Sequence, residues 1–568
     1  MEGQRKRAMD PRRGVALFFA LLLLVGLLAG LTYSRSTDEN SEAAIVRSNI
    51  AEYLLRIFGE DSSVYRAFGG KPISQSVEKD HGVAAYVPLY PLLSLVSRVS
   101  RYWQMELWHG WTFLLFMLGV VSVYGVTREV FRGGRKAGCA AALLYYLTPR
   151  MFAEGHYNNK DMVLLSFVLL VLWLGARLIL YGRIRDALLF SLAGAYAANV
   201  KIIGAWFWGL TGLLFLFSRI ACRRLDKKAW ICGGVAVGAF ALFYCLITPA
   251  IWSDPIGYIT YLLKNARQFS RWNLFVLFEG KAVSVYGGEV PPWYYVPKLM
   301  AMTTPVFIQL LAGIGLFCWI RNAFSSRNSS EDRNERIFLL APLLGSAVPL
   351  LIGMFSGMVV YNGWRHFFFA YSGTFLFAVY GMLCMGRLLS GRLTLRRLGA
   401  AALAVYFCLQ AALLAVNHPL QGSYFNPIAA PFVENNYETD YWFLSLGKAV
   451  SRLCTSRERK GERELTYTTN SLFGSIVEKS DRALPPSAAR YTRDLEKADY
   501  YIAFLSYEQL LNALPDDVSR DFTKGFYEAN GIDPDRAVTE KWNAGGEFRE
   551  LFTLTSYGIP IVTVYERN

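Results

Sequence analysis

"LTPRMFAEGHYNNKDMVLLSFVLLVLWLGARLIL", residues 147–180, places a crowded polar stretch directly before a long apolar run. Residues 161–180 are long enough to span a bilayer, because the hydrocarbon core takes a helix of about 20 residues. Polar groups at membrane depth are costly and commonly functional. This stretch therefore indicates a membrane helix with a candidate site at one end. The polar side chains before the helix are Arg150, Glu154, His156, Asn158, Asn159 and Lys160.

The composition of the whole chain agrees with a membrane protein. Of 568 residues, 53% are hydrophobic and 18% are charged, whereas about one quarter of a soluble chain is charged. The net charge of +15 does not indicate a nucleic-acid partner, because the basic residues fall in short clusters between apolar runs. The eight cysteines form no CxxC pair, so we expect small buried thiols rather than disulfides or a zinc site.

The apolar runs predict a multi-pass α-helical membrane protein with about eleven transmembrane helices. The first run could be a signal peptide, but its length and the lack of a clear cleavage site favour an uncleaved helix. Residues 86–98 could form a further, half-inserted segment. The expected spans are 14–33, 109–130, 137–149, 161–180, 187–202, 203–219, 229–251, 298–320, 337–358, 365–385 and 398–416.

Basic clusters such as REVFRGGRK and RIACRRLDKK alternate with the longer, aromatic connections. Since cytoplasmic loops are rich in Lys and Arg, the N-terminus is expected inside and the C-terminus outside, in a bacterial plasma membrane. We predict two domains, a transmembrane domain over 1–416 and a small extracytoplasmic α/β domain over 417–568. The main outer loops are then 34–108, which begins with an amphipathic helix, and 252–297.

The tail alternates short helical and extended patterns. KAVSRL and SYEQLLNAL favour helices, and ELTYTT and ADYYIAFL favour strands. The last twenty residues indicate a β-hairpin that turns at Gly558.

Several charged residues at the outer face have two interpretations. Asp38 and Glu39 could be ordinary charges at a helix N-terminus or a catalytic pair. Asp161 could simply cap the helix that it begins. Lys201 could extend to the interface or bind a phosphate.

Several motifs follow one another along the chain: TDE after the first span, DHGVAAYVPLYPLL, LTPRMFAEGHYNNKD, NVKIIG, PPWYYVPKLMAMTTP, YNGWRHFFF and HPLQGSYFNPIAAPFVENNYETDYW. In this order they resemble glycosyltransferase family 39, a branch of the C-type membrane glycosyltransferases that includes protein O-mannosyltransferases and aminoarabinose transferases. Each motif alone is weak, but their order and predicted membrane side are specific.

The resemblance implies a polyprenyl-phosphate-linked sugar as donor and transfer, normally with inversion, to an acceptor hydroxyl outside the cytoplasm. It places Asp38, with Glu39 beside it, near the acceptor, and Asp161 in a second acidic motif, so the expected catalytic residues are Asp38, Glu39 and Asp161. Lys201 and Arg365 match positions that would hold the donor phosphate, and we add Arg150 and Lys160 to this set. The expected substrate-binding residues are His156, Asn158, Asn159, His366, Trp293 and Tyr294.

Other partners and functions stay open. The acceptor could be a protein, a lipid or a glycan, and membrane lipids surround the bundle. No HExxH or paired-His spacing assigns a metal, although a divalent cation is not ruled out by the sequence. The alternative functions are a transporter or flippase of lipid-linked intermediates and a non-catalytic receptor. A transporter would carry charges at mid-helix, whereas the polar groups here gather at one face. A receptor would not need Asp38 and Lys201.

Overall fold

The computed structural model describes residues 10–267, 275–284, 291–323, 330–356, 360, 362–459, 465–471, 474–477, 489–514 and 547–568. Within these residues, nine helices are long and apolar enough to cross a membrane. They are α1 (Pro11–Gly30), α5 (Arg101–Glu129), α8 (Asp161–Tyr181), α10 (Ile203–Ala221), α11 (Lys227–Ile247), α14 (Val306–Ala323), α15 (Ser330–Phe355), η4 with α16 (Arg365–Ala370 and Tyr371–Leu388) and α17 (Leu393–Val416).

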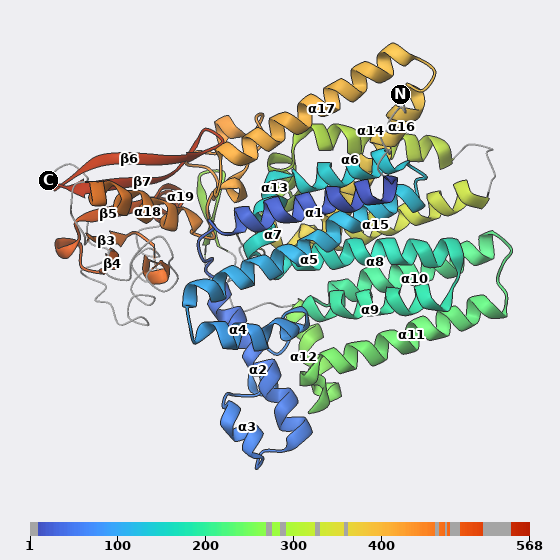
Figure 1. Cartoon of the computed structure of the whole chain (residues 1–568), viewed down its shortest axis with the longest axis horizontal. Helices are drawn as coiled ribbons and strands as arrows, with labels where there is room; N and C mark the ends of the chain where they lie inside the picture. The colour runs from blue at the N-terminus through green and yellow to red at the C-terminus, as the bar shows by residue number, and fades with distance from the viewer. Residues whose placement is uncertain are drawn as a thin grey trace, which may run out of the picture.

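Two shorter helices occupy the remaining predicted spans. These are α6 (Arg135–Tyr146) and α9 (Ile184–Val200), which run among the long helices (Figure 1). Within the described residues, each of the eleven predicted runs is mostly helical, and the prediction of a multi-pass helical membrane protein is confirmed.

The predicted span 298–320 is wrong at its start. The chain there forms α13 (Tyr295–Thr303), and α14 begins only at Val306. Thr304 is extended, with φ −91° and ψ 134°, because it precedes Pro305. The half-inserted segment expected at 86–98 is a pair of short helices, η2 (Ala84–Leu89) and α4 (Tyr90–Ser97).

Most connecting elements gather at one end of the bundle, on the left in Figure 1, together with the C-terminal sheet. We call this end the site end. The elements there include α7 (Pro149–Tyr157), a helix of nine residues where only a turn was expected. The others are α2 (Glu39–Phe58), α3 (Ser63–Phe68), η1 (Ile73–Gln75), η3 (Pro249–Trp252), α12 (Pro255–Arg267), β1 (Phe275–Phe278) and β2 (Lys281–Ser284).

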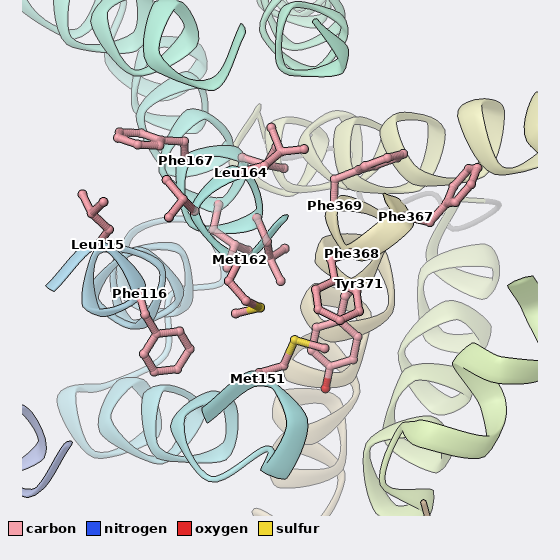
Figure 2. Packing of buried hydrophobic residues seen from close by; sticks show 14 of the residues in the cluster. Leu115, Phe116, Met151, Met162, Leu164, Phe167, Phe367, Phe368, Phe369 and Tyr371 are labelled. Atoms are coloured by element: carbon pink, nitrogen blue, oxygen red, sulfur yellow. The ribbon is translucent and has the colours of Figure 1, made fainter. Parts of the chain in front are cut away.

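Buried apolar side chains lie between α5, α7, α8 and η4 (Figure 2). Phe116, Met151, Met162, Phe368 and Tyr371 are all nearly inaccessible. Interiors packed this closely tolerate little displacement. This packing therefore fixes the helix ends that carry the polar side chains of the site end.

The C-terminal part forms a five-stranded sheet in the order β4-β3-β5-β7-β6. Strands β4, β3 and β5 are parallel, and the antiparallel pair β6–β7 turns at Tyr557 and Gly558, both with positive φ, as the predicted hairpin requires. The prediction of a small α/β domain is confirmed. Its elements are η5 (Gln421–Ser423), η6 (Ala430–Phe432), α18 (Leu444–Arg459), β3 (Leu465–Thr469), η7 (Gly474–Ile476), β4 (Ala489–Tyr491), η8 (Leu495–Lys497), β5 (Tyr500–Phe504), α19 (Leu505–Ala513), β6 (Phe548–Ser556) and β7 (Ile559–Arg567).

Candidate functional site

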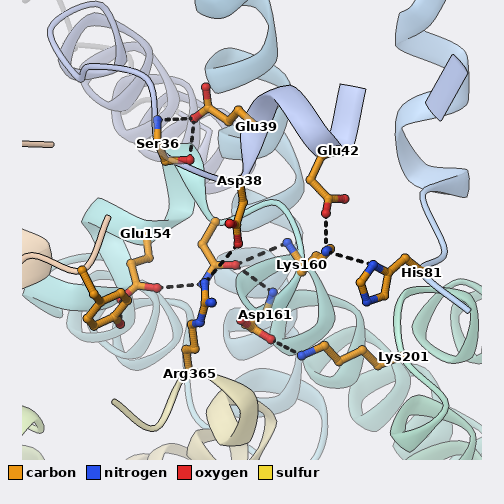
Figure 3. A network of polar contacts seen from close by, with 12 residues as sticks. Ser36, Asp38, Glu39, Glu42, His81, Glu154, Lys160, Asp161, Lys201 and Arg365 are labelled. Carbon is orange, nitrogen blue, oxygen red and sulfur yellow. Dashed lines mark hydrogen bonds and ion pairs between the residues drawn. The ribbon is translucent and has the colours of Figure 1, made fainter. Parts of the chain in front are cut away.

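Three ion pairs meet at the site end, between α2, α7, α8, α9 and η4 (Figure 3). Their partners come from positions that are far apart in the sequence. Arg365 Nη1 lies 3.2 Å from Asp38 Oδ2, and Lys201 Nζ lies 2.5 Å from Asp161 Oδ1. The third pair joins Lys160 to Glu42. The fold thus brings together Asp38, Asp161, Lys160, Lys201 and Arg365, as the sequence predicts.

The start of α2 directs its carboxylates to two sides. Asp38 and Glu42 are four residues apart and share the face that meets the cations. Glu39 turns away from them. Its Oε1 accepts hydrogen bonds from the backbone N–H and hydroxyl of Ser36, at 3.3 and 3.1 Å, and lies 2.9 Å from His109 Nε2. The structure therefore places Glu39 in packing against α5 rather than beside Asp38.

The N-terminus of α8 is capped by a residue other than the expected one. Asn158 Oδ1 accepts from the backbone N–H groups of Lys160 and Asp161, at 3.3 and 2.8 Å. Asparagine in this role satisfies the free N–H groups of a helix start. The Asp161 carboxylate is consequently not needed for capping, and it pairs with Lys201. Asn158 Nδ2 donates to Glu154 Oε2 at 2.7 Å, so this side chain is held at both ends.

Lys160 joins the first outer segment to the start of α8. Besides contacting Glu42, its ammonium lies 3.2 Å from His81 Nδ1. The same ring nitrogen lies 2.6 Å from Glu78 Oε2. These contacts connect the ion pairs with the surface of the 34–108 segment.

Arg150 is 2% exposed and meets the chain after the last span. Its Nη1 donates to the Tyr441 hydroxyl at 3.2 Å, its Nη2 donates to the Tyr424 carbonyl at 3.3 Å, and its guanidinium lies over the Phe425 ring. The Tyr441 hydroxyl donates to Glu154 Oε1 at 3.2 Å. The Tyr441 hydroxyl thus connects Arg150 to Glu154, which in turn binds Asn158.

The loop before Arg365 is anchored to the same segment. Asn362 and Gly363 have positive φ, and Asn362 Nδ2 donates to Glu438 Oε1 at 3.2 Å. Burial raises the pKa of Glu438 to about 8. This carboxyl is therefore largely protonated at neutral pH and adds little negative charge near Arg365.

Other predicted substrate residues lie elsewhere or contribute differently. His156 is fully buried, stacks on Phe113 at 4.3 Å, and has each ring nitrogen 2.9 Å from a backbone carbonyl, of Phe152 and Gly26. It therefore joins α7 to α1 and leaves no ring nitrogen for a substrate.

Asn159 is 5% exposed, and its Nδ2 has no hydrogen-bond partner among the described residues. His366 follows Arg365 and lies within electrostatic range of Lys160 and Lys201.

Trp293 and Tyr294 do not contact the ion pairs. The Trp293 ring is 57% exposed and stacks on Phe355, with centroids 6.4 Å apart. The Tyr294 hydroxyl donates to Glu279 Oε2 at 3.2 Å. Glu279, the partner of Tyr294, also lines a separate hollow of about 580 Å³ together with Lys298.

In each ion pair the carboxylate and the cation neutralise each other at a surface that is only partly exposed to water. Isolated charges there would be costly to desolvate, and pairing offsets that cost. Among the three paired carboxylates, Asp38 is 38% exposed, whereas Glu42 and Asp161 are 1% and 5% exposed. Asp38 is therefore the carboxylate that an incoming molecule can reach. Among the described residues, no group of three or more His, Cys, Asp or Glu side chains could hold a metal ion.

Three residues of this site were not predicted. Glu42 could have been found, because its spacing of four from Asp38 puts both on one helical face. Tyr441 meets Arg150, 291 residues earlier in the chain, and the Arg365 guanidinium lies over the Trp442 ring, 4.6 Å from its centre. The segment of these two residues has no regular periodicity, so no local pattern indicates either contact.

Residues 96–252 match the family described as dolichyl-phosphate-mannose-protein mannosyltransferases. Among solved structures, ArnT from Cupriavidus metallidurans bound to undecaprenyl phosphate is 13% identical over 98% of each chain, with a TM-score of 0.42. Its apo state gives 12% identity, 98% of each chain and a TM-score of 0.43. Arabinosyltransferase EmbB from Mycobacterium smegmatis is 15% identical over 67% of this chain and 32% of its own, with a TM-score of 0.35. No curated protein is a significant match.

The family match runs from the residues before α5 to the end of η3 and includes the sequence stretches around Arg150, Asp161 and Lys201. The predicted resemblance to glycosyltransferase family 39 is thereby confirmed.

Proposed function

We propose that this protein is a membrane glycosyltransferase that moves a sugar from a polyprenyl-phosphate-linked donor to an acceptor hydroxyl at the extracytoplasmic face, with inversion. The family match of residues 96–252 supports a sugar transferase with a lipid-phosphate donor. The observation that carries the mechanism is the accessible Asp38 beside three cations, which are themselves held by carboxylates.

In this mechanism Asp38 accepts the proton of the acceptor hydroxyl as its oxygen bonds to the anomeric carbon. The bond from that carbon to the phosphate oxygen breaks at the same time, and the electron pair leaves with the lipid phosphate. Arg365, Lys201 and Lys160 stabilise the developing charge on that phosphate because their positions are fixed before the reaction. Arg365 pairs with Asp38, so a donor phosphate bound by Arg365 competes with the Asp38 carboxylate and frees the base.

The distribution of exposed basic residues supports the proposed orientation. The connections at the end of the bundle opposite the site end carry exposed basic residues, including Arg223, Arg224, Lys227 and Lys228. Cytoplasmic loops are enriched in such residues. The site end, with the C-terminal domain, then faces the extracytoplasmic side.

The test is to incubate the purified protein with a panel of polyprenyl-phosphate sugars and to measure release of free lipid phosphate. Asp38→Asn is expected to abolish release while expression stays normal. The matched control is Asp61→Asn, since Asp61 lies in the same outer segment but its side chain is 97% exposed in a surface pair with Arg66. Full activity of Asp38→Asn would refute the proposed base, and no release from any donor would refute the proposed activity.

A further inference from the structure

Four consecutive residues, 440–443, connect the C-terminal domain with the ion pairs of the site end. The first and the last of them are fixed in the domain. The Asp440 carboxylate accepts from the backbone N–H groups of Leu444 and Ser445, at 3.2 and 2.7 Å, and so caps α18. The Phe443 ring packs edge-on against Phe504 at the end of β5, with centroids 4.7 Å apart.

The two middle residues point the other way, into the site end. The Tyr441 hydroxyl lies between Arg150 Nη1 and Glu154 Oε1, 3.2 Å from each. The Arg365 guanidinium lies 4.6 Å from the centre of the Trp442 ring and 5.9 Å from that of Tyr441. Two cations of the candidate phosphate set are therefore in contact with this one dipeptide.

The Trp442 side chain contributes its ring face rather than its polar atom. It is 4% exposed, and its Nε1 has no hydrogen-bond partner among the described residues. A cation above an aromatic face is attracted by the ring, and the attraction grows when water is excluded. The indole face thus limits where the Arg365 guanidinium can lie while its Nη1 reaches Asp38.

We infer that Tyr441 and Trp442 are positioning residues for Arg150 and Arg365, so that the C-terminal domain completes the donor-phosphate site. This inference rests on the proposed function. It gives the domain a part in donor binding, whatever acceptor the protein uses. Because Asp440 and Phe443 hold the dipeptide from both sides, a shift of the domain would also shift the two arginine side chains.

The test is calorimetric titration of the purified full-length protein with farnesyl phosphate, a short polyprenyl phosphate. Trp442→Leu is expected to weaken binding about tenfold, and Trp442→Phe, which keeps a ring face, is expected to restore most of the loss. Tyr441→Phe removes only the hydroxyl and is expected to weaken binding about three- to tenfold. Adding Trp442→Leu to Arg365→Gln is expected to cause little further loss, because the tryptophan acts through the arginine.

Phe432→Leu is the matched control, since Phe432 is an aromatic residue of the same segment that is 66% exposed. It is expected to bind as the unchanged protein does. If Arg365→Gln weakens binding but Trp442→Leu and Tyr441→Phe do not, the positioning role is refuted and the proposed function stands. If Arg365→Gln binds normally, the donor-phosphate assignment fails, and this inference fails with it. If Trp442→Leu does not fold, Tyr441→Phe decides the question.

Discussion

Neighbouring carboxylates at the start of α2 have different surroundings. Asp38 is reachable and pairs with Arg365, whereas Glu39 is buried against Ser36 and His109. A general base has to reach the proton that it accepts. A buried side chain whose contacts are satisfied within the protein instead contributes to stability. Substitutions of Asp38 and Glu39 are therefore expected to have different effects, on turnover and on stability respectively.

Glu39→Gln is expected to lower stability more than turnover. Its loss of charge weakens the buried contacts with Ser36 and His109, and we expect a cost of about 1–3 kcal/mol. The checks are the thermal unfolding midpoint in detergent and the transfer rate per folded molecule, which should stay near that of the unchanged protein. Asp38→Asn is the comparison, with the opposite pattern. Lost turnover at an unchanged midpoint for Glu39→Gln would make Glu39 catalytic.

The sequence was enough to predict which polar residues lie together at the site end. It was not enough to predict which atoms form the hydrogen bonds and ion pairs between them. The sequence leaves Asp161 with two interpretations, a catalytic carboxylate or a cap, since aspartate at a helix start commonly caps the helix. In the structure Asn158 caps the helix and Asp161 binds Lys201, forty residues later. That choice depends on how α9 ends beside α8, which is a tertiary contact. The contacts of Tyr441 and Trp442 could not be predicted for the same reason.

At the scale of helices, length and hydropathy predict the spans well and the breaks poorly. The predicted span 298–320 ignores Pro305, where the backbone leaves the helical region and α13 separates from α14. Helix contacts were not predicted at all, since apolar runs do not indicate their neighbours. Between α14 and α16, two glycines allow the backbones to touch. A Cβ on Gly315 would lie 1.9 Å from the Phe377 carbonyl oxygen, and one on Gly381 would lie 2.0 Å from that of Leu311.

Gly381→Leu is therefore expected to force α14 and α16 apart. Small residues permit close helix packing in membranes, and overpacking costs about 1–3 kcal/mol or more. The thermal unfolding midpoint of the purified protein should fall clearly. Gly386→Leu in the same helix is the control, because a Cβ there meets nothing within 4 Å. Equal midpoints for the two variants would show that the close contact contributes nothing to stability.

Across the whole molecule, charge is distributed unevenly between the two ends of the bundle. The site end holds its carboxylates and cations in pairs. The opposite end also holds ion pairs, such as Arg132 with Asp332 and Arg177 with Glu129, but its connections carry further exposed basic residues, including Arg223 and Lys228. A lipid-phosphate donor needs its cations at the membrane boundary on one side only. The proposed reaction therefore requires that α2 and the C-terminal domain share the extracytoplasmic side, and that the start of α17 lies in the cytoplasm.

Single cysteines test this arrangement. Ile57→Cys in α2 and Leu495→Cys in the C-terminal domain replace side chains that are 61% and 40% exposed, and Leu393→Cys at the start of α17 replaces one that is 60% exposed. A membrane-impermeant maleimide applied to intact cells should label the first two, and Leu393→Cys only after permeabilisation. The unchanged chain measures the background from its eight native cysteines. Labelling of Leu393→Cys in intact cells, with protection of the other two, would reverse the orientation and put the proposed site on the cytoplasmic face.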